Sequence, residues 1–388
     1  MSLLSYLIWT ADPEFFTIPF LDRSVRYYGL LFALGFLISQ QIMFYMYRKE
    51  GKPEKDVETL TVFMIIATII GARLGHVFFY EPDKYLANPL DILKIWEGGL
   101  ASHGAAFGIL LALWLYTRYD IGFKGLKLKT ERITRPGQNW LQVVDRIVIV
   151  VALTGCLIRF GNFMNHEIYG IPTNSSYGVV FTNNINSFFG EPNSPIADID
   201  YEKRDADLNE DGAVPIQLNL TLKNHPDLRT KEHVATYLEG RFKELLTSYS
   251  YINEHISQSK SRPLDFEISK NSDGTFSAAV NTYAIARHPT QLYESGTSLA
   301  LFFLLFIIWS RYREQTPPGL LFGIFLILLF GLRFVHELFK ENQVAFEDGM
   351  AFNMGQILSI PLIMFGIIVL IRSLTIGKVE KQTPQDSH

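Results

Sequence analysis

The chain has 388 residues, of which 48% are hydrophobic, 14% aromatic and only 19% charged. This composition is too apolar for an ordinary soluble protein, and the apolar residues are concentrated in blocks. The formal net charge of −4 averages over those blocks and does not indicate a nucleic-acid partner. We therefore predict an all-α polytopic membrane protein.

Membrane-crossing helices need about 20 consecutive apolar residues, which span the hydrocarbon core of a bilayer. Seven segments meet this requirement. They are 28–47, 58–80, 100–117, 143–164, 291–309, 319–338 and 355–372. The first ten residues are also apolar, but no Lys or Arg precedes them and Asp12-Pro13 ends the run early. We expect an interfacial helix there and not a signal peptide.

Basic residues alternate between the loops and predict the orientation of the chain, because short loops rich in Lys and Arg stay in the cytoplasm. The basic connections are those between the first and second, third and fourth, and fifth and sixth segments, together with the tail. The alternate loops at 81–99 and 339–354 are acidic. We therefore expect the N-terminus on the outer side of the membrane and the C-terminus in the cytoplasm.

The polar interval 171–286 is far longer than an ordinary loop. Alternating residues predict strands at 214–222, 264–269 and 275–285, with a turn at 271–274 between the last two, and a helical pattern covers 231–251. We expect an inserted extracytoplasmic α+β domain with its core at 191–286. The organisation is then a membrane domain at 1–170 that includes spans one to four, this loop, a membrane domain at 287–373 that includes spans five to seven, and a tail at 374–388.

Several kinds of soluble-protein chemistry lack a signature in this sequence. Asp207–Gly212 matches the first half of a calcium loop, but Leu218 occupies the position that needs a bidentate Glu, which favours a simple acidic turn. Cys156 lies inside a predicted span, where an apolar filler is favoured over a nucleophile. No Cys or His cluster has metal-ligand spacing, and we expect neither a metal nor a cofactor.

Polar residues of the predicted spans fall at one depth. Ionisable groups in membrane helices are costly and normally face a bundle interior or a wet cavity. With the predicted orientation, those in this chain gather in the outer half of the bilayer. They are Arg73, Arg159 and Arg333 near the ends of outward spans, and Tyr28, His103, Glu294, Asn353 and Gln356 near the starts of inward ones. Scattered structural polar residues would not share a depth.

These residue types suit a phospholipid headgroup. Arginine is a fork-shaped permanent cation that pairs with phosphate oxygens, and an imidazole is a natural proton acceptor at neutral pH. Arg333 and Glu337 share one helix face, as do Asn162 and Asn165. We expect a pocket for a lipid phosphate with His103 as a candidate general base.

Alternative readings remain for each residue. Arg73 and Arg333 could snorkel to the outer interface, Tyr28 could be an aromatic-belt residue, and His103 could be a structural histidine. Asp145-Arg146 favours a structural role or an inner-leaflet headgroup contact. A transporter for an anionic lipid or solute would also bury charge, but it should show internal repeats and a midplane site. A non-catalytic lipid-binding protein would not need His103.

Six motifs of this chain resemble those of the bacterial prolipoprotein diacylglyceryl transferases. The most specific is the signature segment 159–170, RFGNFMNHEIYG, in which the family usually has glycine at the position of His166. The others lie in the expected order at 26–29, 71–75, 98–104, 287–294 and 333–337. The resemblance covers both membrane halves and fails at 191–286, which many members replace with a short loop.

The resemblance implies a reaction. It is transfer of the diacylglyceryl group of phosphatidylglycerol to the lipobox cysteine thiol of a preprolipoprotein, the first step of bacterial lipoprotein maturation. Arg159 and Arg333 would bind the phosphate and His103 would be the base, although substrate phosphate or Glu167 could accept the proton instead. The remaining predicted contacts with phosphatidylglycerol are Asn162, Glu167, Gly170, Tyr28, Arg73, Glu294 and Glu337.

Overall fold

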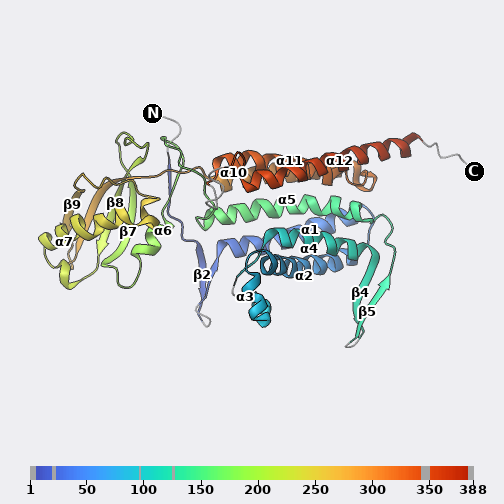
Figure 1. Ribbon diagram of the computed structural model, residues 1–388, viewed down its shortest axis with the longest axis horizontal. Coiled ribbons are helices and arrows are strands. Elements are labelled where there is room, and N and C mark those ends of the chain that lie inside the picture. Colours follow the sequence, from blue (N-terminus) through green and yellow to red (C-terminus); the bar gives the residue numbers. More distant parts are fainter. Residues whose placement is uncertain (1–5, 20–22, 96–97, 125–126, 342–349, 383–388) are drawn as a thin grey trace, which may run out of the picture. The chain divides into compact units, whose positions relative to one another are not determined.

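The computed structural model describes residues 6–19, 23–95, 98–124, 127–341 and 350–382 of the chain. The chain divides into two compact units, each assembled from separate stretches. The first unit contains residues 1–31, 158–295 and 335–353, and the second contains 32–157, 296–334 and 354–388. Figure 1 labels their elements along the sequence.

Long apolar helices dominate the second unit. They are α1 (Tyr27–Lys49), α2 (Glu54–Phe79), α4 (Ser102–Arg118), α5 (Trp140–Met164), α10 (Thr290–Tyr312), α11 (Leu320–His336) and α12 (Met354–Gln382), and the ends of α1, α5, α10 and α11 belong to the first unit. Within the described residues, six of these seven are long and apolar enough to cross a membrane. The predicted polytopic membrane protein is confirmed at this level. The seventh, α4, has 17 residues, at the lower end of the length that crosses a bilayer.

Glycines set the spacing of α2 and α4 in the second unit. A Cβ atom on Gly104 would lie 2.7 Å from the Cα of Gly75, and one on Gly108 would lie 3.1 Å from the Cα of Gly71. Such distances leave no room for a side chain, so the two backbones are in direct contact. Small residues are a common means of helix association in membranes.

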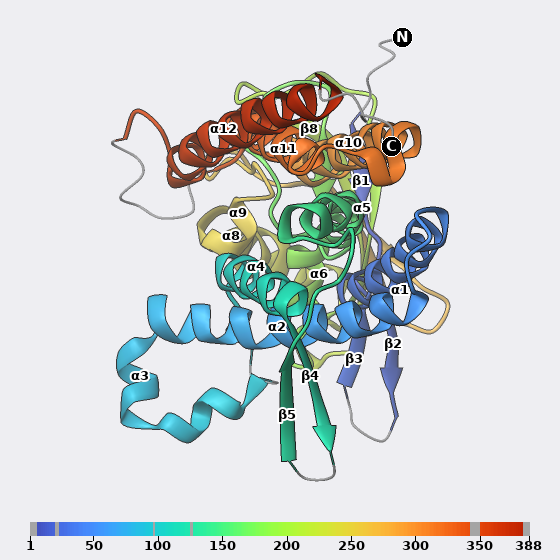
Figure 2. The same ribbon diagram turned by 90° about the vertical axis from the view of Figure 1, so that its right-hand side faces the viewer.

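Short elements connect these helices. The α2–α4 connection contains α3 (Pro82–Ala87) and the 3₁₀ helix η1 (Pro89–Leu93), and the α4–α5 connection is a hairpin of β4 (Tyr119–Lys124) and β5 (Lys127–Arg132). Figure 2 shows both connections projecting from the α2–α4 pair. Two 3₁₀ turns, η5 (Arg313–Gln315) and η6 (Glu337–Phe339), follow α10 and α11. The hairpin was not predicted.

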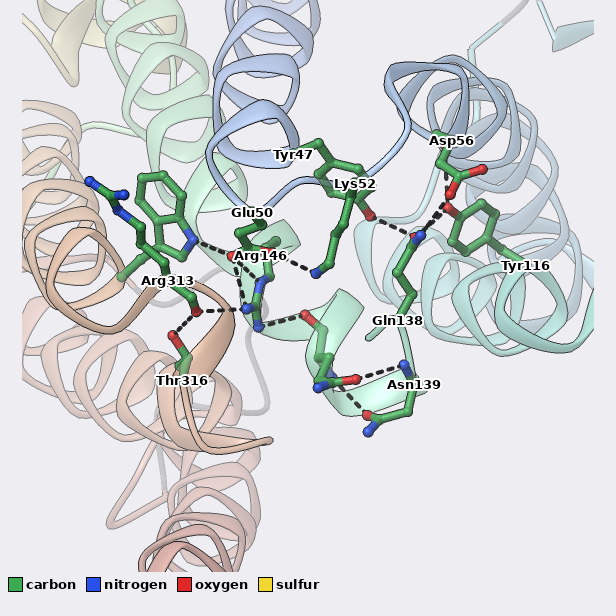
Figure 3. A network of polar contacts seen from close by, with 12 residues as sticks. Tyr47, Glu50, Lys52, Asp56, Tyr116, Gln138, Asn139, Arg146, Arg313 and Thr316 are labelled. Atoms are coloured by element: carbon green, nitrogen blue, oxygen red, sulfur yellow. Dashed lines mark hydrogen bonds and ion pairs between the residues drawn. The ribbon is translucent and has the colours of Figure 1, made fainter. Parts of the chain in front are cut away.

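A buried polar network ties several segments of the second unit together (Figure 3). Arg146 is 1% exposed and donates from Nε and Nη2 to Glu50 Oε1 at 3.0 and 2.9 Å, and from Nη2 to the Arg313 carbonyl at 2.9 Å. Trp309 Nε1 and Lys52 Nζ also contact the Glu50 carboxylate. Burial opposes ionisation of Glu50, but Arg146 and Lys52 outweigh it and lower its pKa.

Asp145, the residue before Arg146, also has a structural role. Its carboxylate accepts from the backbone N–H groups of Gly319 at 2.7 Å and Phe322 at 2.8 Å, which caps the start of α11. With Arg146 bound to Glu50 and Asp145 bound to α11, the Asp145-Arg146 pair joins helices. Of the two predicted roles for this pair, the structural one agrees with these contacts.

An antiparallel four-stranded sheet forms much of the first unit, in the order β7-β8-β10-β9. Its strands are β7 (Ile196–Lys203), β8 (Val214–Leu222), β9 (Asp265–Lys270) and β10 (Phe276–Ala284). The predicted strands at 214–222, 264–269 and 275–285 correspond to β8, β9 and β10. The edge strand β7 was missed, because Asp198 and Asp200 interrupt its apolar pattern.

Helices cover this sheet with a shared core. They are η3 (Pro226–Leu228), α7 (Lys231–Tyr237), the π-helical η4 (Leu238–Phe242), α8 (Lys243–Ser248) and α9 (Ser250–Asn253), which match the helical pattern predicted over 231–251. Leu218, Val280, Phe242 and Leu246 are all fully buried in one apolar cluster. Tyr6 and α6 (Asn183–Phe189), which lie outside 191–286, contribute to the same cluster. The core of the sheet therefore extends beyond residues 191–286.

The N-terminal segment is a strand where we expected an interfacial helix. β1 (Leu7–Trp9) pairs in parallel with β6 (Val179–Phe181), and the Leu7 N–H donates to the Gly178 carbonyl at 2.9 Å. That prediction was wrong for the described residues, because pairing with a distant strand overrides local helical preference. A second pair, β2 (Glu14–Ile18) with β3 (Arg23–Arg26), precedes α1.

Candidate active site

The signature segment begins on the last turns of α5 and continues into a tight loop. Asn162 and Asn165 are buried, and the backbone N–H of Glu167 donates to the Asn162 carbonyl at 2.9 Å. His166 and Ile168 have φ values of 56° and 57°, in the left-handed region that non-glycine residues rarely adopt. The chain thus turns back on itself immediately after the helix.

A chain of ionic contacts lies in the same unit. Arg159 Nε is 2.7 Å from Glu294 Oε2, and Lys340 Nζ is 2.5 Å from Glu294 Oε1. Lys340 also lies 3.4 Å from Glu337 Oε1, and Asn353 Nδ2 donates to Glu337 Oε2 at 3.3 Å. The structure therefore brings together three predicted site residues, Arg159, Glu294 and Glu337.

Exposure differs along this ionic chain. The side chains of Glu294, Glu337 and Lys340 are between 6% and 9% exposed, whereas that of Arg159 is 29% exposed. The Glu294 carboxylate holds Arg159 through Nε. Within the described residues, the two terminal nitrogens of Arg159 donate no hydrogen bond to another side chain or to the backbone. That edge of the guanidinium is the part which can meet a ligand.

Lys340 is a member of this site that the sequence did not reveal. Lys340 follows Glu337 by three residues, just past the apolar pattern of α11. It therefore lies outside the motif at 333–337. The signal available was an acidic and a basic residue at a spacing of three, which is the pairing seen here. A single such pair is too common at helix ends to identify a site.

Tight packing surrounds the Arg159 end of the ionic chain. A Cβ atom on Gly161 would lie 3.0 Å from the Cα of Tyr28, so Tyr28 rests directly on α5. Gln291 Nε2 donates to the Glu167 carbonyl at 2.6 Å, and Asn165 Nδ2 donates to Glu167 Oε1 at 3.2 Å. The signature loop is thereby fastened to the first turn of α10.

Gly170 allows close approach of two backbones at the end of the signature. Its N–H donates to the His288 carbonyl at 2.8 Å, and a Cβ atom there would lie 2.7 Å from Thr290 Cγ2 and meet the Phe339 carbonyl. The predicted contact between Gly170 and the lipid stays a prediction. The geometry explains why glycine is needed here.

His166 holds the N-terminal segment. Its Nε2 donates to the Ala11 carbonyl at 2.8 Å, and its ring packs against Trp9 and Phe181. Burial lowers the pKa of His166, so the ring is neutral at pH 7. The ring therefore occupies a structural position beside the signature loop.

Arg287 joins the signature to the sheet. Its guanidinium donates to the Gly170 carbonyl at 3.2 Å and to the Glu254 carbonyl at 3.0 Å, and it lies 5.0 Å from the centre of the Tyr169 ring. His255 also contacts Tyr169, with its Nε2 3.4 Å from the Tyr169 hydroxyl oxygen. Burial lowers the pKa of His255 to about 4. Motif comparison gave Arg287 no individual role, because these partners are distant in sequence.

The remaining predicted residues, Arg73, His103 and Arg333, belong to the second unit. His103 is half-buried in the first turn of α4, where it stacks on Tyr80 and meets the edge of Phe79. Arg333 is exposed on α11, four residues before Glu337. Both are accessible side chains, which is consistent with ligand contact.

Arg73 is buried and bonded to backbone. It is 3% exposed and donates to the backbone carbonyls of five residues, namely Asp91, Ile92, Lys94, Gly98 and Gly99. A guanidinium committed to five carbonyls is a poor partner for a lipid phosphate. The geometry instead favours a role in shaping the loop that leads to His103.

The long apolar helices and the ionic chain define a polytopic membrane protein with an arginine–carboxylate site. Comparison with known proteins agrees with that class. The family model for prolipoprotein diacylglyceryl transferase matches residues 13–372, which is most of the chain. The chain belongs to this family.

Three relatives illustrate the extent of the match, and each is called a phosphatidylglycerol–prolipoprotein diacylglyceryl transferase. The protein of Tolumonas auensis is 33% identical over 95% of this chain and 97% of its own length. Those of Chloroherpeton thalassium and Porphyromonas gingivalis are each 30% identical, over 98% and 96% of this chain and 99% and 97% of their own lengths. These relatives are matched along nearly their whole lengths.

Proposed function

We propose that this chain transfers the diacylglyceryl group of phosphatidylglycerol to the lipobox cysteine thiol of preprolipoproteins. Family membership and the names of the relatives support the donor, the acceptor and the group transferred. A sulfur–carbon bond forms at the glyceryl carbon, and the bond from that carbon to the phosphate oxygen breaks. The products are a thioether and glycerol phosphate.

Within the site, the position of Arg159 is the observation that best supports this function. Glu294 pairs with its Nε and is itself paired with Lys340, which leaves the terminal nitrogens of Arg159 for two oxygens of a phosphate. Charge develops on that phosphate as the carbon–oxygen bond breaks, and a fixed guanidinium stabilises it without reorganisation. Arg333 is the second phosphate ligand. Tyr28, Asn162, Glu167 and Gly170 line the donor site, and Glu294 and Glu337 orient the cations.

His103 is the proposed general base. A cysteine thiol has a pKa of about 8.5, so it must lose its proton before it attacks at neutral pH. An imidazole side chain can accept that proton. Arg73 then acts indirectly, because it holds backbone carbonyls of residues 91–94 and 98–99. The Ala101 N–H, which donates to the Ala72 carbonyl, fixes the start of α4.

The arrangement in the membrane is also part of the proposal. We count α4 as a seventh crossing, which puts the N-terminus outside the bacterial inner membrane and the C-terminus in the cytoplasm. The alternation of basic and acidic loops supports this orientation. Residues 191–286 then form an inserted extracytoplasmic domain.

Alanine substitution of the two arginines tests the site. In membranes supplied with phosphatidylglycerol and a lipobox peptide, Arg159→Ala and Arg333→Ala should each reduce thioether formation at least about 100-fold, the usual loss on removal of a transition-state donor. Arg311→Ala is the matched control, because Arg311 is an exposed arginine in the last turn of α10. Transfer at the control rate by either site variant, with normal expression, would contradict the assigned phosphate role.

A further inference from the structure

A cavity of about 460 Å³ lies in the first unit, outside the ionic chain. Five stretches of the sequence form its walls: 172–174 after the signature, 211–213 after β7, Thr247 in α8, 253–258 from the end of α9, and 285–286 after β10. Its volume falls in the range of about 300–1,000 Å³ that is usual for ligand pockets. No motif of the sequence predicted it.

The walls of this cavity are fixed before any ligand arrives. Asn209 Oδ1 accepts from the backbone N–H groups of Asp211 at 3.1 Å and Ala213 at 2.7 Å, and its Nδ2 donates to Ser257 Oγ at 2.9 Å. Gly212, with a φ of 75°, packs on the backbone of Asn174, where a Cβ atom would lie 2.8 Å away. These contacts hold the acidic turn in place.

The chemistry of the lining excludes a phosphate and fits a peptide. Its polar side chains are those of Asn174, Thr247, Asn253, Ser257 and Gln258, with Asp211 as the one charged group, and the described lining contains no Lys or Arg. A lipid phosphate needs cations, which this cavity does not supply. Amide and hydroxyl groups both donate and accept hydrogen bonds, as the peptide groups of an extended chain require.

The cavity lies close along the chain to the ionic site of the same unit. Pro172 follows Gly170 by two residues, and Ala286 precedes Arg287, which donates to the Gly170 carbonyl. From Ala286 to Glu294 the chain has four non-helical and four helical steps, so their Cα atoms are at most about 20 Å apart. About six residues of extended peptide cover that distance.

We infer that this cavity binds the acceptor polypeptide, through the polar segment that follows its reactive cysteine by up to about six residues. The inference rests on the proposed function, which supplies a polypeptide acceptor. In secretory signals an apolar stretch precedes the processing site, so the polar residues that suit this lining are those on the C-terminal side. The cavity thereby adds a peptide subsite to the lipid site.

A bulky side chain in the cavity tests the subsite. Asn253 is exposed and lines the cavity, so Asn253→Trp fills space without burying a new group. With a lipobox peptide that extends about ten residues beyond the cysteine, this variant should raise KM for the peptide at least about ten-fold. The value of kcat and the KM for phosphatidylglycerol should stay unchanged, because the lipid site is untouched.

The matched control is Asn224→Trp, the same change at an exposed position after β8 that does not line the cavity. It should leave every constant unchanged. A peptide that ends two residues beyond the cysteine is too short to reach the cavity, so Asn253→Trp should not change its KM. An unaltered KM for the long peptide, or an equal rise for both peptides, would overturn the inference.

Crosslinking separates the subsite from the transfer reaction. A photoreactive residue at Thr247, which lines the cavity, should capture a long lipobox peptide whose cysteine is replaced by serine, and one at Asn224 should not. Capture by a protein that shows no transfer with the cysteine peptide would refute the proposed function and retain the subsite. Transfer without capture at Thr247 would do the reverse.

Discussion

His166 adopts a left-handed backbone conformation, with a φ of 56°, at the position where the family resemblance leads us to expect glycine. A left-handed conformation costs a non-glycine residue roughly 1–2 kcal/mol, which glycine avoids. The side chain of His166 offsets this strain, because its ring donates a hydrogen bond to the Ala11 carbonyl and packs on Trp9 and Phe181. The departure from the family pattern is therefore compensated locally.

His166→Gly should accordingly lower the free energy of unfolding and leave the chemistry intact. Loss of a buried ring and its hydrogen bond costs about 2–4 kcal/mol, and relief of the left-handed strain returns about 1, for a net loss of about 1–3 kcal/mol. Thermal unfolding in detergent measures this loss. Asn174→Gly is the control, because Asn174 has a φ of 47° and an exposed side chain, and it should be neutral or stabilising.

Transfer activity of His166→Gly separates structure from catalysis. The variant restores the residue common in the family, so we expect activity within about two-fold of the parent at a temperature where both are folded. A loss as large as that expected for Arg159→Ala would assign His166 a part in the reaction.

Single site residues could be predicted where a charged side chain stands in an apolar helix, because burying a charge in a membrane is unfavourable. Arg159, Glu294 and Glu337 stood out as charges in apolar helices, and the structure places them in one ionic chain with Lys340. Arg73 met the same criterion but binds carbonyls of a loop 18 to 26 residues away. Charge in an apolar run reveals that a partner exists, whereas its identity depends on how the chain folds.

The close contact between α2 and α4 sets the relative position of two predicted site residues. Arg73 lies on α2 and His103 on α4, and glycines at 71, 75, 104 and 108 let the two backbones touch. Any side chain between them must push the helices apart. The position of His103 relative to the Arg73 loop then changes as well.

Gly104→Ala tests this coupling. Its new Cβ atom would meet the Gly75 Cα at 2.7 Å, and overpacking of this kind costs about 1–3 kcal/mol. We expect a lower melting temperature in detergent and reduced transfer. Gly331→Ala, in α11, has no atom within 4 Å of the new methyl group and should be neutral or slightly stabilising. Equal stability of the two variants would exclude a role for close α2–α4 packing.

Helices and strands differed in how well the sequence predicted them. Each of the seven predicted spans coincides with a helix, and six of these helices, among the described residues, are long and apolar enough to cross a membrane. A long apolar run has few other solutions in a membrane. β1 was mistaken for a helix, and β2 to β7 were missed. Each of these strands is stabilised by pairing with another segment, which a local pattern does not encode.

The orientation of the whole molecule can be measured directly. A cysteine placed at Asn224 in the proposed outer domain should react with a membrane-impermeant maleimide in spheroplasts. One placed at Thr134, in the basic α4–α5 connection, should react only after lysis. Cys156 is buried and gives a low background. Labelling of both sites from outside, or of Thr134→Cys alone, would contradict the proposed topology.

Dependence of the reaction on the acceptor thiol tests the central claim most directly. The measurement is transfer of labelled diacylglyceryl from phosphatidylglycerol to two lipobox peptides that differ only in cysteine or serine at the acceptor position. The account predicts a thioether product and an equal amount of glycerol phosphate with the cysteine peptide, and neither product with the serine peptide. Equal products from both peptides, or none from the cysteine peptide with folded protein, would contradict it.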